Sequence, residues 1–183
     1  VLMVRALQAR LSRTELVEQI SPVAADMRQL PFADGVFNAI TCRFGVMFVP
    51  PVPALAEMRR VLCADGRGAL LLWGRRQDNP LLDAMFQVAS NFLGAQAMAI
   101  NAMMFRDAEA GALDAAAAEC GFADIQSSRI DFTQPSNKWQ AQWRMLFGNQ
   151  LEPAQRPIAE QQLAELLASA GLLPGRLRLL RLA

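Results

Sequence analysis

Blocks of apolar residues along this chain alternate between strand-like runs and helix-like spacing. Residues 36–44 are apolar at most positions, as is typical of a parallel strand that is covered on both faces. A cluster of prolines then favours a helix start, and Leu55, Met58 and Leu62 recur at helical spacing. A second apolar run follows at 68–73. A strand, a helix and a strand in this order predict a βαβ unit and therefore a parallel sheet.

The same patterns predict further elements on both sides of this unit, within a single domain over 1–183. Asp65-Gly66 is expected to end the helix that begins near Pro53. The other expected elements are, in chain order, a helix over 2–18, an extended piece at 23–25, a helical region over 80–104, a helix over 107–120, a strand over 125–132, a helix over 153–170 and a shortened strand over 176–182.

Composition narrows the classes of protein that fit this pattern. The chain has 183 residues, of which 53% are hydrophobic and 19% are charged, so it is long and apolar enough to bury a core. A net charge of +1 offers no electrostatic footprint for nucleic acid or an anionic membrane surface. The uncharged stretch 84–105 carries too many polar groups for a membrane span. Three cysteines far apart in the sequence favour unpaired thiols in a reducing, cytoplasmic compartment.

The sequence contains no histidine and no tyrosine. Their absence excludes the commonest general base, the commonest zinc ligand and every Ser-His or Cys-His nucleophile. No metal site is expected. Any chemistry must therefore depend on positioning, on carboxylates or on a cofactor that brings its own reactivity.

Two stretches carry a family resemblance, AADMRQLPFADGVFNAITCRFGVMFVPP over 24–51 and ALAEMRRVLCADGRGALLLWG over 54–74. In the first, an acid precedes Leu-Pro-Phe and a turn leads into a strand. In the second, Glu-x-x-Arg-Val-Leu precedes a glycine turn into the next strand. Their order and spacing resemble the class I S-adenosylmethionine-dependent methyltransferases, in the branch that contains the ubiquinone and menaquinone methyltransferases. The likeness covers about 15–132, with Asn38 in place of the family's usual Asp.

The resemblance implies a Rossmann-like, doubly wound and mostly parallel α/β sheet with the strand order 3-2-1-4-5-7-6. Residues 36–44 would form the fourth strand. The family's glycine-rich loop, and the acid that binds the cofactor ribose, would lie upstream of the first helix. We therefore expect an N-terminally truncated domain that lacks the first two strands of this fold.

The resemblance also implies S-adenosyl-L-methionine as the cofactor, bound by Asp26, Met27, Arg43 and Phe44. Asp26 would accept a hydrogen bond from the adenine amino group and Met27 would pack against the adenine ring. Arg43 and Phe44 would line the methionine half of the cofactor. All four follow the third or fourth strand of the resembled fold, and ligands bind outside the carboxyl ends of such strands. From the residues alone, a turn-stabilising Asp26, a core Met27 and a solvated Arg43 stay open as alternatives.

The methyl acceptor is expected to be a small, lipophilic or aromatic molecule, bound by the segments 80–105 and 134–170. Adaptable apolar surface or, alternatively, plain core comes from Met85, Phe86, Phe92, Met103, Met104, Phe105, Trp139, Trp143 and Phe147. No general base stands out, because Asp107 and Asp131, the available candidates, also fit surface or capping positions.

Two other functions stay open at this point. One is a non-catalytic, methyltransferase-like fragment or partner subunit that lacks the glycine-rich cofactor loop. The other is a nicotinamide-dependent Rossmann enzyme, which would need the same loop and leaves the Leu-Pro-Phe motif unexplained.

The expected strand order generates a prediction about association. Without the first two strands, 36–44 becomes a sheet edge that neither charge nor proline protects before Arg43. We expect the 183-residue chain to self-associate through this edge and to bind S-adenosylmethionine weakly or not at all. Sedimentation of the chain tests this expectation, and a stable monomer with tight cofactor binding would contradict it.

Overall fold

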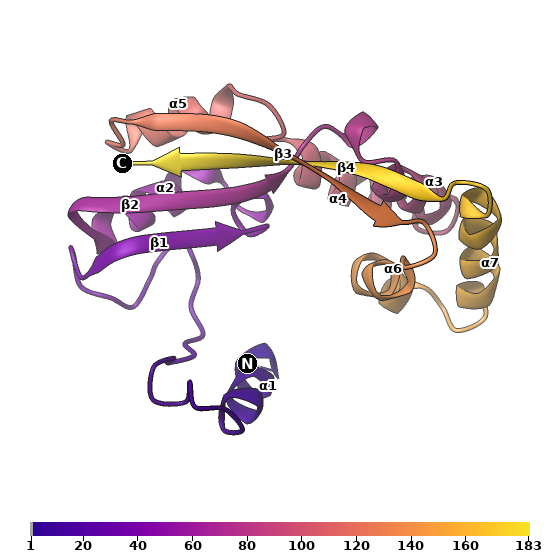
Figure 1. Cartoon of the computed structure of the whole chain (residues 1–183), viewed down its shortest axis with the longest axis horizontal. Coiled ribbons are helices and arrows are strands. Elements are labelled where there is room, and N and C mark those ends of the chain that lie inside the picture. The colour runs from indigo at the N-terminus through magenta and orange to yellow at the C-terminus, as the bar shows by residue number, and fades with distance from the viewer. Residues whose placement is uncertain (1) are drawn as a thin grey trace.

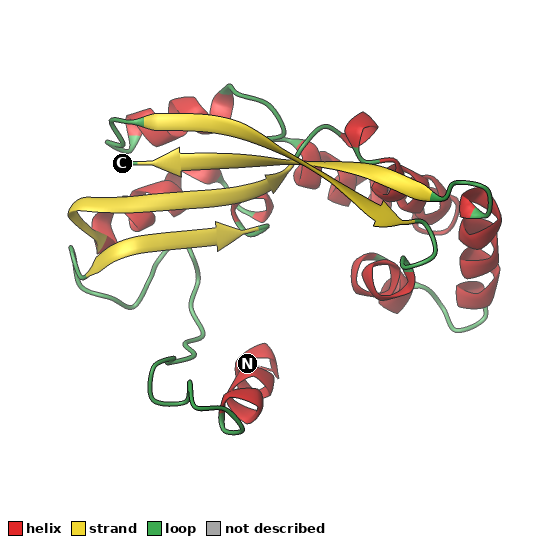
Figure 2. Ribbon diagram, in the orientation of Figure 1, coloured by secondary structure: helices red, strands yellow, loops and turns green. Residues whose placement is uncertain are grey.

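A mixed four-stranded sheet organises residues 2–183, the part of the chain that the computed structural model describes (Figures 1 and 2). The strands are β1 (Phe37–Arg43), β2 (Leu62–Trp73), β3 (Ile125–Pro135) and β4 (Leu172–Leu182), in the spatial order β1-β2-β4-β3. β1 and β2 are parallel, whereas β4 runs antiparallel to both of its neighbours.

Seven helices and three short 3-10 turns complete the described part of the chain. The helices are α1 (Leu2–Leu11), α2 (Pro51–Val61), α3 (Pro80–Leu93), α4 (Ala95–Phe105), α5 (Ala112–Glu119), α6 (Gln140–Leu146) and α7 (Gln155–Leu167). The 3-10 turns are η1 (Val46–Phe48), η2 (Arg76–Asp78) and η3 (Gly148–Gln150). None of these helices is long and apolar enough to cross a lipid bilayer.

The core lies on one face of the sheet. Along β2 and β4, Leu70, Leu72 and Leu180 are fully buried, whereas Leu71 and Leu179 on the other face are half-buried. In Figure 2 the strands lie in front of α2 and α5, while α1 stands apart below β1 at the end of an extended segment. The sheet therefore has one face packed on helices and one face that is less covered.

The βαβ unit is confirmed, because β1, α2 and β2 follow one another and the two strands pair in parallel. The α/β class is confirmed as well. The observed order matches the last four positions of the expected order, 4-5-7-6, when β1 is taken as the fourth strand. Three of the four strands, β1, β2 and β3, run in the same direction, and β4 alone runs against them, between β2 and β3.

Several expected boundaries are wrong, and side chains explain the first of them. α1 ends at Leu11 rather than near 18, because the Ser12 and Thr14 hydroxyls donate to the carbonyls of Ala9 and Leu11 and so compete with further helix. The piece at 23–25 is irregular and joins no strand.

The second apolar strand is longer than its apolar run. β2 begins at Leu62 directly after α2, so Asp65-Gly66 lies inside the strand instead of ending the helix. Residues 36–44 are not covered on both faces either, since Asn38 and Thr41 of the edge strand β1 are exposed.

The observed bounds of the later elements also differ from the expected ones. The helix expected at 107–120 begins only at Ala112, whereas β3 and β4 each extend over 11 residues, so β4 is not cut short. The helical region over 80–104 is confirmed as two consecutive helices, α3 and α4.

A cluster of polar side chains links residues 30–32, the Leu-Pro-Phe segment, to α2. The Arg60 guanidinium donates to the carbonyl oxygens of Leu30 and Phe32 at 3.1 and 2.8 Å. It also pairs with Glu57 at 2.8 Å, and Glu57 in turn accepts the backbone N–H of Leu30 at 2.8 Å. The hydrogen bonds from Arg60 and from the Leu30 N–H hold the pKa of Glu57 at about 2. Two motifs that the resemblance brought together are thus joined physically.

This cluster predicts an acid-dependent loss of stability. The pKa of Glu57 falls from 4.5 to about 2 on folding, so the carboxylate stabilises the folded state fully above about pH 4.5 and loses that effect as the pH falls toward 2. Glu57→Gln should lower the free energy of unfolding by about 1–2 kcal/mol at pH 7, with a difference that shrinks below pH 4. Urea unfolding at several pH values measures this.

The matched control is Glu18→Gln, at an exposed carboxylate in the segment after α1. Its unfolding should follow that of the unmodified chain at every pH. A Glu57→Gln deficit that stays constant down to pH 2.5 would refute the role assigned to the ionised carboxylate.

Candidate functional site

An apolar cavity of about 830 Å³ opens where the parallel strands β1 and β2 end. Its lining residues are Met3, Arg43, Phe44, Met47, Phe48, Trp73, Met104, Gln142, Met145 and Leu146. They come from the carboxyl ends of both parallel strands, from η1 and from α1, α4 and α6. The carboxyl edge of a parallel pair is where open α/β sheets bind ligands, so this cavity is the candidate site.

The floor of the cavity is an aromatic pair at the ends of two neighbouring strands. The rings of Phe44 and Trp73 are stacked, with centroids 4.8 Å apart and an angle of 11° between the ring planes. Phe44 has φ +56°, the one positive φ outside glycine among the described residues. Its N–H still donates to Leu71 of β2 at 2.9 Å, so the chain turns away only after the last ladder bond. Backbone strain of this kind concentrates at ligand sites.

Among the described residues that line the cavity, Arg43 alone is charged, and Gln142 adds a polar amide. The Arg43 guanidinium lies 5.4 Å from the centroid of the Phe44 ring, in a cation–π contact. Within the part of the chain that the structure describes, Arg43 makes no ion pair. The cavity therefore presents one cation on an apolar surface.

The structure separates the four predicted cofactor residues into two pairs. Arg43 and Phe44 line the cavity, as described above, and Asp26 and Met27 do not. Asp26 is exposed and accepts both the backbone N–H and the guanidinium of Arg28, at 2.9 and 2.6 Å. The guanidinium bond, followed by the N–H bond, lowers the pKa of Asp26 to about 2.

Met27 does not line the cavity and lies close to Gly45, the residue after Phe44. A Cβ on Gly45 would come within 3.0 Å of Met27 Cε and 2.8 Å of Cys42 Sγ, so both side chains pack closely against this glycine. Met27 is half-buried and packs against the core. This packing supports the alternative that Met27 is a core residue. Its contact with the adenine ring of the cofactor stays a prediction.

The predicted acceptor segments contribute to the cavity, but through fewer residues than expected. Met104 lines it, whereas Phe86, Trp143 and Phe147 form an aromatic cluster in the core with centroids 4.9 and 5.5 Å apart. Gln142, Met145 and Leu146 of α6 line it without having been predicted. Apolar residues at 139, 143 and 147 recur at helical spacing and mark the buried side of α6. The residues of α6 that line the cavity lie on its other side.

Neither candidate general base reaches the cavity. Asp107 is buried and pairs with Arg106 at 2.8 Å. Asp131 is exposed and pairs with Arg176 at 2.6 Å. Both carboxylates therefore take part in structural ion pairs instead of facing the cavity.

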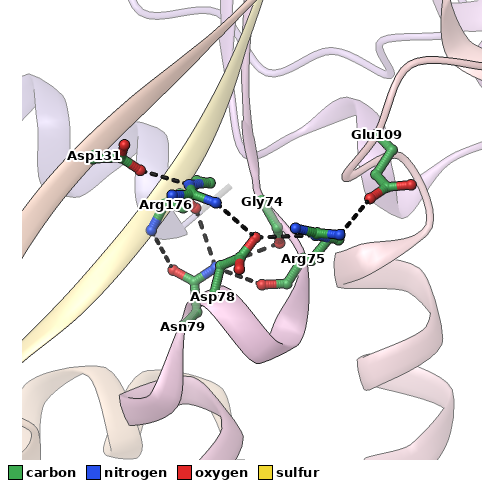
Figure 3. Close-up of polar contacts among 7 residues, drawn as sticks. All are labelled: Gly74, Arg75, Asp78, Asn79, Glu109, Asp131 and Arg176. Atoms are coloured by element: carbon green, nitrogen blue, oxygen red, sulfur yellow. Dashed lines mark hydrogen bonds and ion pairs between the residues drawn. The ribbon is translucent and has the colours of Figure 1, made fainter.

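A polar network that sequence reasoning missed fixes the strand end below the cavity (Figure 3). Asn79 is fully buried, and its amide donates to the carbonyls of Arg75 and Arg176 at 2.9 and 3.1 Å. Its carbonyl oxygen accepts the N–H of Arg176 at 2.9 Å. Asn79 thus ties the segment after Trp73 to β4. The sequence signal was an asparagine directly before Pro80, the first residue of α3.

Ion pairs extend this network outward. Arg176 pairs with Asp131 and, at 3.3 Å, with Asp78, while Arg75 pairs with Asp78 and Glu109 at 3.1 and 3.2 Å. Burial opposes ionisation of Asp78, but the hydrogen bond from Arg75 and the charges of both arginines outweigh it and lower the pKa of this carboxyl. The chain of pairs links β3, β4, η2 and the segment before α5 (Figure 3).

Comparison with known proteins places this cavity in a family context. The profile of the methyltransferase domain family matches residues 2–70. The ubiquinone/menaquinone biosynthesis C-methyltransferase UbiE of Rhizobium rhizogenes is 37% identical over 82 residues, which are 44% of this chain and 31% of that protein. Over residues 2–70 the chain is thus similar to the class I S-adenosylmethionine-dependent methyltransferases. The family's cofactor is S-adenosylmethionine.

Further similarities agree with this assignment. Demethylmenaquinone methyltransferase of Beutenbergia cavernae is 52% identical over 46 residues, which are 25% of this chain and 19% of that protein. The matches thus span less than a third of these curated relatives. The solved structure of the YcgJ protein of Bacillus subtilis shares the fold, with a TM-score of 0.59 and 16% identity over 98% of this chain and 76% of that one.

The cavity fits part of S-adenosylmethionine, the cofactor of the family that the chain resembles. Its volume of about 830 Å³ lies in the range of small-molecule sites, and its thioether and aromatic walls suit the apolar parts of the cofactor. Its one cation, Arg43, suits a carboxylate. No acid among the described lining residues is available to the ribose hydroxyls.

The buried network predicts a measurable effect on stability. Asn79→Ala leaves the N–H of Arg176 and the carbonyl of Arg75 without their partner, which should lower the free energy of unfolding by about 2–4 kcal/mol. Urea unfolding at pH 7 measures the loss. Asn137→Ala, at an exposed turn, serves as the matched control and should change stability by less than about 0.5 kcal/mol. Equal stabilities of the two variants would contradict the structural role of Asn79.

Proposed function

We propose that this chain is part of an enzyme that transfers a methyl group from S-adenosylmethionine to a small, lipophilic or aromatic molecule. The observation that carries the proposal is the apolar cavity at the carboxyl ends of β1 and β2, with its stacked Phe44 and Trp73. Methionine, phenylalanine and tryptophan side chains bind flat, apolar molecules well and adapt to their shape.

The names of the relatives support an aromatic acceptor. UbiE and demethylmenaquinone methyltransferase are named for quinone biosynthesis, and a quinone precursor combines a flat ring with apolar substituents. A cavity with one cation on apolar walls matches such a molecule better than it matches a polar sugar or a nucleotide acceptor.

The residues of this chain would act mainly by positioning. S-adenosylmethionine supplies a methyl group on a positively charged sulfur, which is reactive without further activation. Phe44 and Trp73 would orient the acceptor ring, and the apolar walls would exclude water. Orientation of two reactants can supply about 7–11 kcal/mol of the barrier. A mechanism of this kind needs neither histidine nor tyrosine, and the chain has neither.

Asp26 is proposed as the acceptor for the adenine amino group. Its carboxylate is exposed and held by Arg28 alone, so replacing it should leave the fold intact. In the full-length gene product, Asp26→Ala should weaken S-adenosylmethionine binding about 10- to 100-fold, because a hydrogen bond to a charged acceptor is worth about 1.5–3 kcal/mol. Isothermal titration calorimetry measures this.

Asp65→Ala is the control, since Asp65 is an exposed carboxylate of β2 outside the cavity. It should bind the cofactor as the unmodified protein does. Unchanged affinity in Asp26→Ala would remove Asp26 from the site, and no binding by the unmodified full-length protein would refute the proposed function itself.

A further inference from the structure

Arg43 is a cation without a countercharge at the mouth of an apolar cavity. Nine of the ten lining residues are uncharged, and none of the described ones is acidic. Arg43 is exposed, so an anion that enters the cavity can reach its guanidinium, which pairs well with an oxyanion. The cavity is therefore built to select a ligand that is apolar in its body and negative at one point.

The neighbours of Arg43 favour the acceptor over the cofactor carboxylate as the source of this anion. Arg43 shares the cavity with Met104, Gln142 and Met145, which come from the two segments expected to bind the acceptor. It does not share it with Asp26, which the resemblance assigns to the cofactor. Within the described chain, Arg43 thus stands with the acceptor residues rather than with the proposed adenine site.

Resting on the proposed function, we propose that Arg43 binds an oxyanion of the methyl acceptor, so that the enzyme takes its aromatic acceptor as a phenolate or enolate. The stack of Phe44 and Trp73 would hold the ring, and the guanidinium over Phe44 would hold the oxygen. An acceptor bound in this form has already lost its proton. This explains how a cavity without a histidine, a tyrosine or an acidic side chain among its described lining residues can host a nucleophile.

A chromogenic phenol tests the inference without any methyl transfer. 4-Nitrophenol absorbs visible light only as the phenolate, and the protein has no tyrosine whose own ionisation would interfere. Bound to the unmodified protein, its ionisation midpoint should fall by about one pH unit, which corresponds to a tenfold preference for the phenolate over the phenol. The neutral 4-nitroanisole should bind about tenfold more weakly than the phenolate.

Variants assign the effect to one side chain. Arg43→Met should abolish the shift and leave 4-nitroanisole binding unchanged, whereas Arg43→Lys should retain part of the shift. Arg67→Met is the matched control, because Arg67 is an exposed arginine on β2 that lies outside the cavity. It should behave as the unmodified protein. No shift in the unmodified protein, or a shift that survives in Arg43→Met, would overturn the inference.

A competition arm separates the acceptor from the cofactor carboxylate. Saturating S-adenosylhomocysteine should leave the 4-nitrophenolate bound and its midpoint shifted. Displacement of the phenolate, with weaker S-adenosylhomocysteine binding by Arg43→Met, would assign Arg43 to the cofactor and overturn the inference. These measurements use the full-length gene product, and its failure to bind S-adenosylhomocysteine at all would refute the proposed function, while the phenolate shift would still decide the role of Arg43.

Discussion

The bond between the Leu-Pro-Phe segment and α2 is the constraint on which the arrangement of the N-terminal third depends. Arg60 donates to two carbonyls of that segment, and Glu57 accepts an N–H from it. The carbonyl of Arg60 also accepts the N–H of Gly35 at 2.9 Å, at the turn that leads into β1. Because α2 connects β1 to β2, one guanidinium fixes the entry to the first strand relative to the second. The side of the cavity formed by the end of β1 therefore depends on the same contacts.

The local patterns were sufficient to predict the βαβ unit but not its limits. Prolines before α2 and the apolar run of β1 act through neighbouring residues, so a sequence reveals them directly. The end of α1 depends on which hydroxyl donates to which carbonyl, and the extent of β4 depends on pairing with β2 and β3, whose residues are distant from β4 in the sequence. Such choices are made by tertiary contacts, which no periodicity encodes.

The candidate site divides along the same line. Arg43 and Phe44 follow a recognisable strand, so their place at its carboxyl end could be predicted. Trp73 could have been added by the same rule, since it ends the second parallel strand. Gln142 and Met145 could not, because their position depends on how α6 docks through Trp143. The resemblance assigned four motif residues to one cofactor site, and their division between the cavity and the adjacent loop depends on tertiary structure.

The position of Trp73 in the cavity lining depends on contacts outside the cavity. Trp73 can stack on Phe44 only if β2 ends where it does, and β2 ends where Gly74 meets β4. A Cβ on Gly74 would lie 2.8 Å from the Arg176 carbonyl, so glycine allows the two backbones to approach, and Asn79 then holds them together through both groups of Arg176. The cavity has few polar groups of its own. The buried amide of Asn79, which lies outside the cavity, thus holds this strand end in place. A rigid floor is what a site that works by orientation requires.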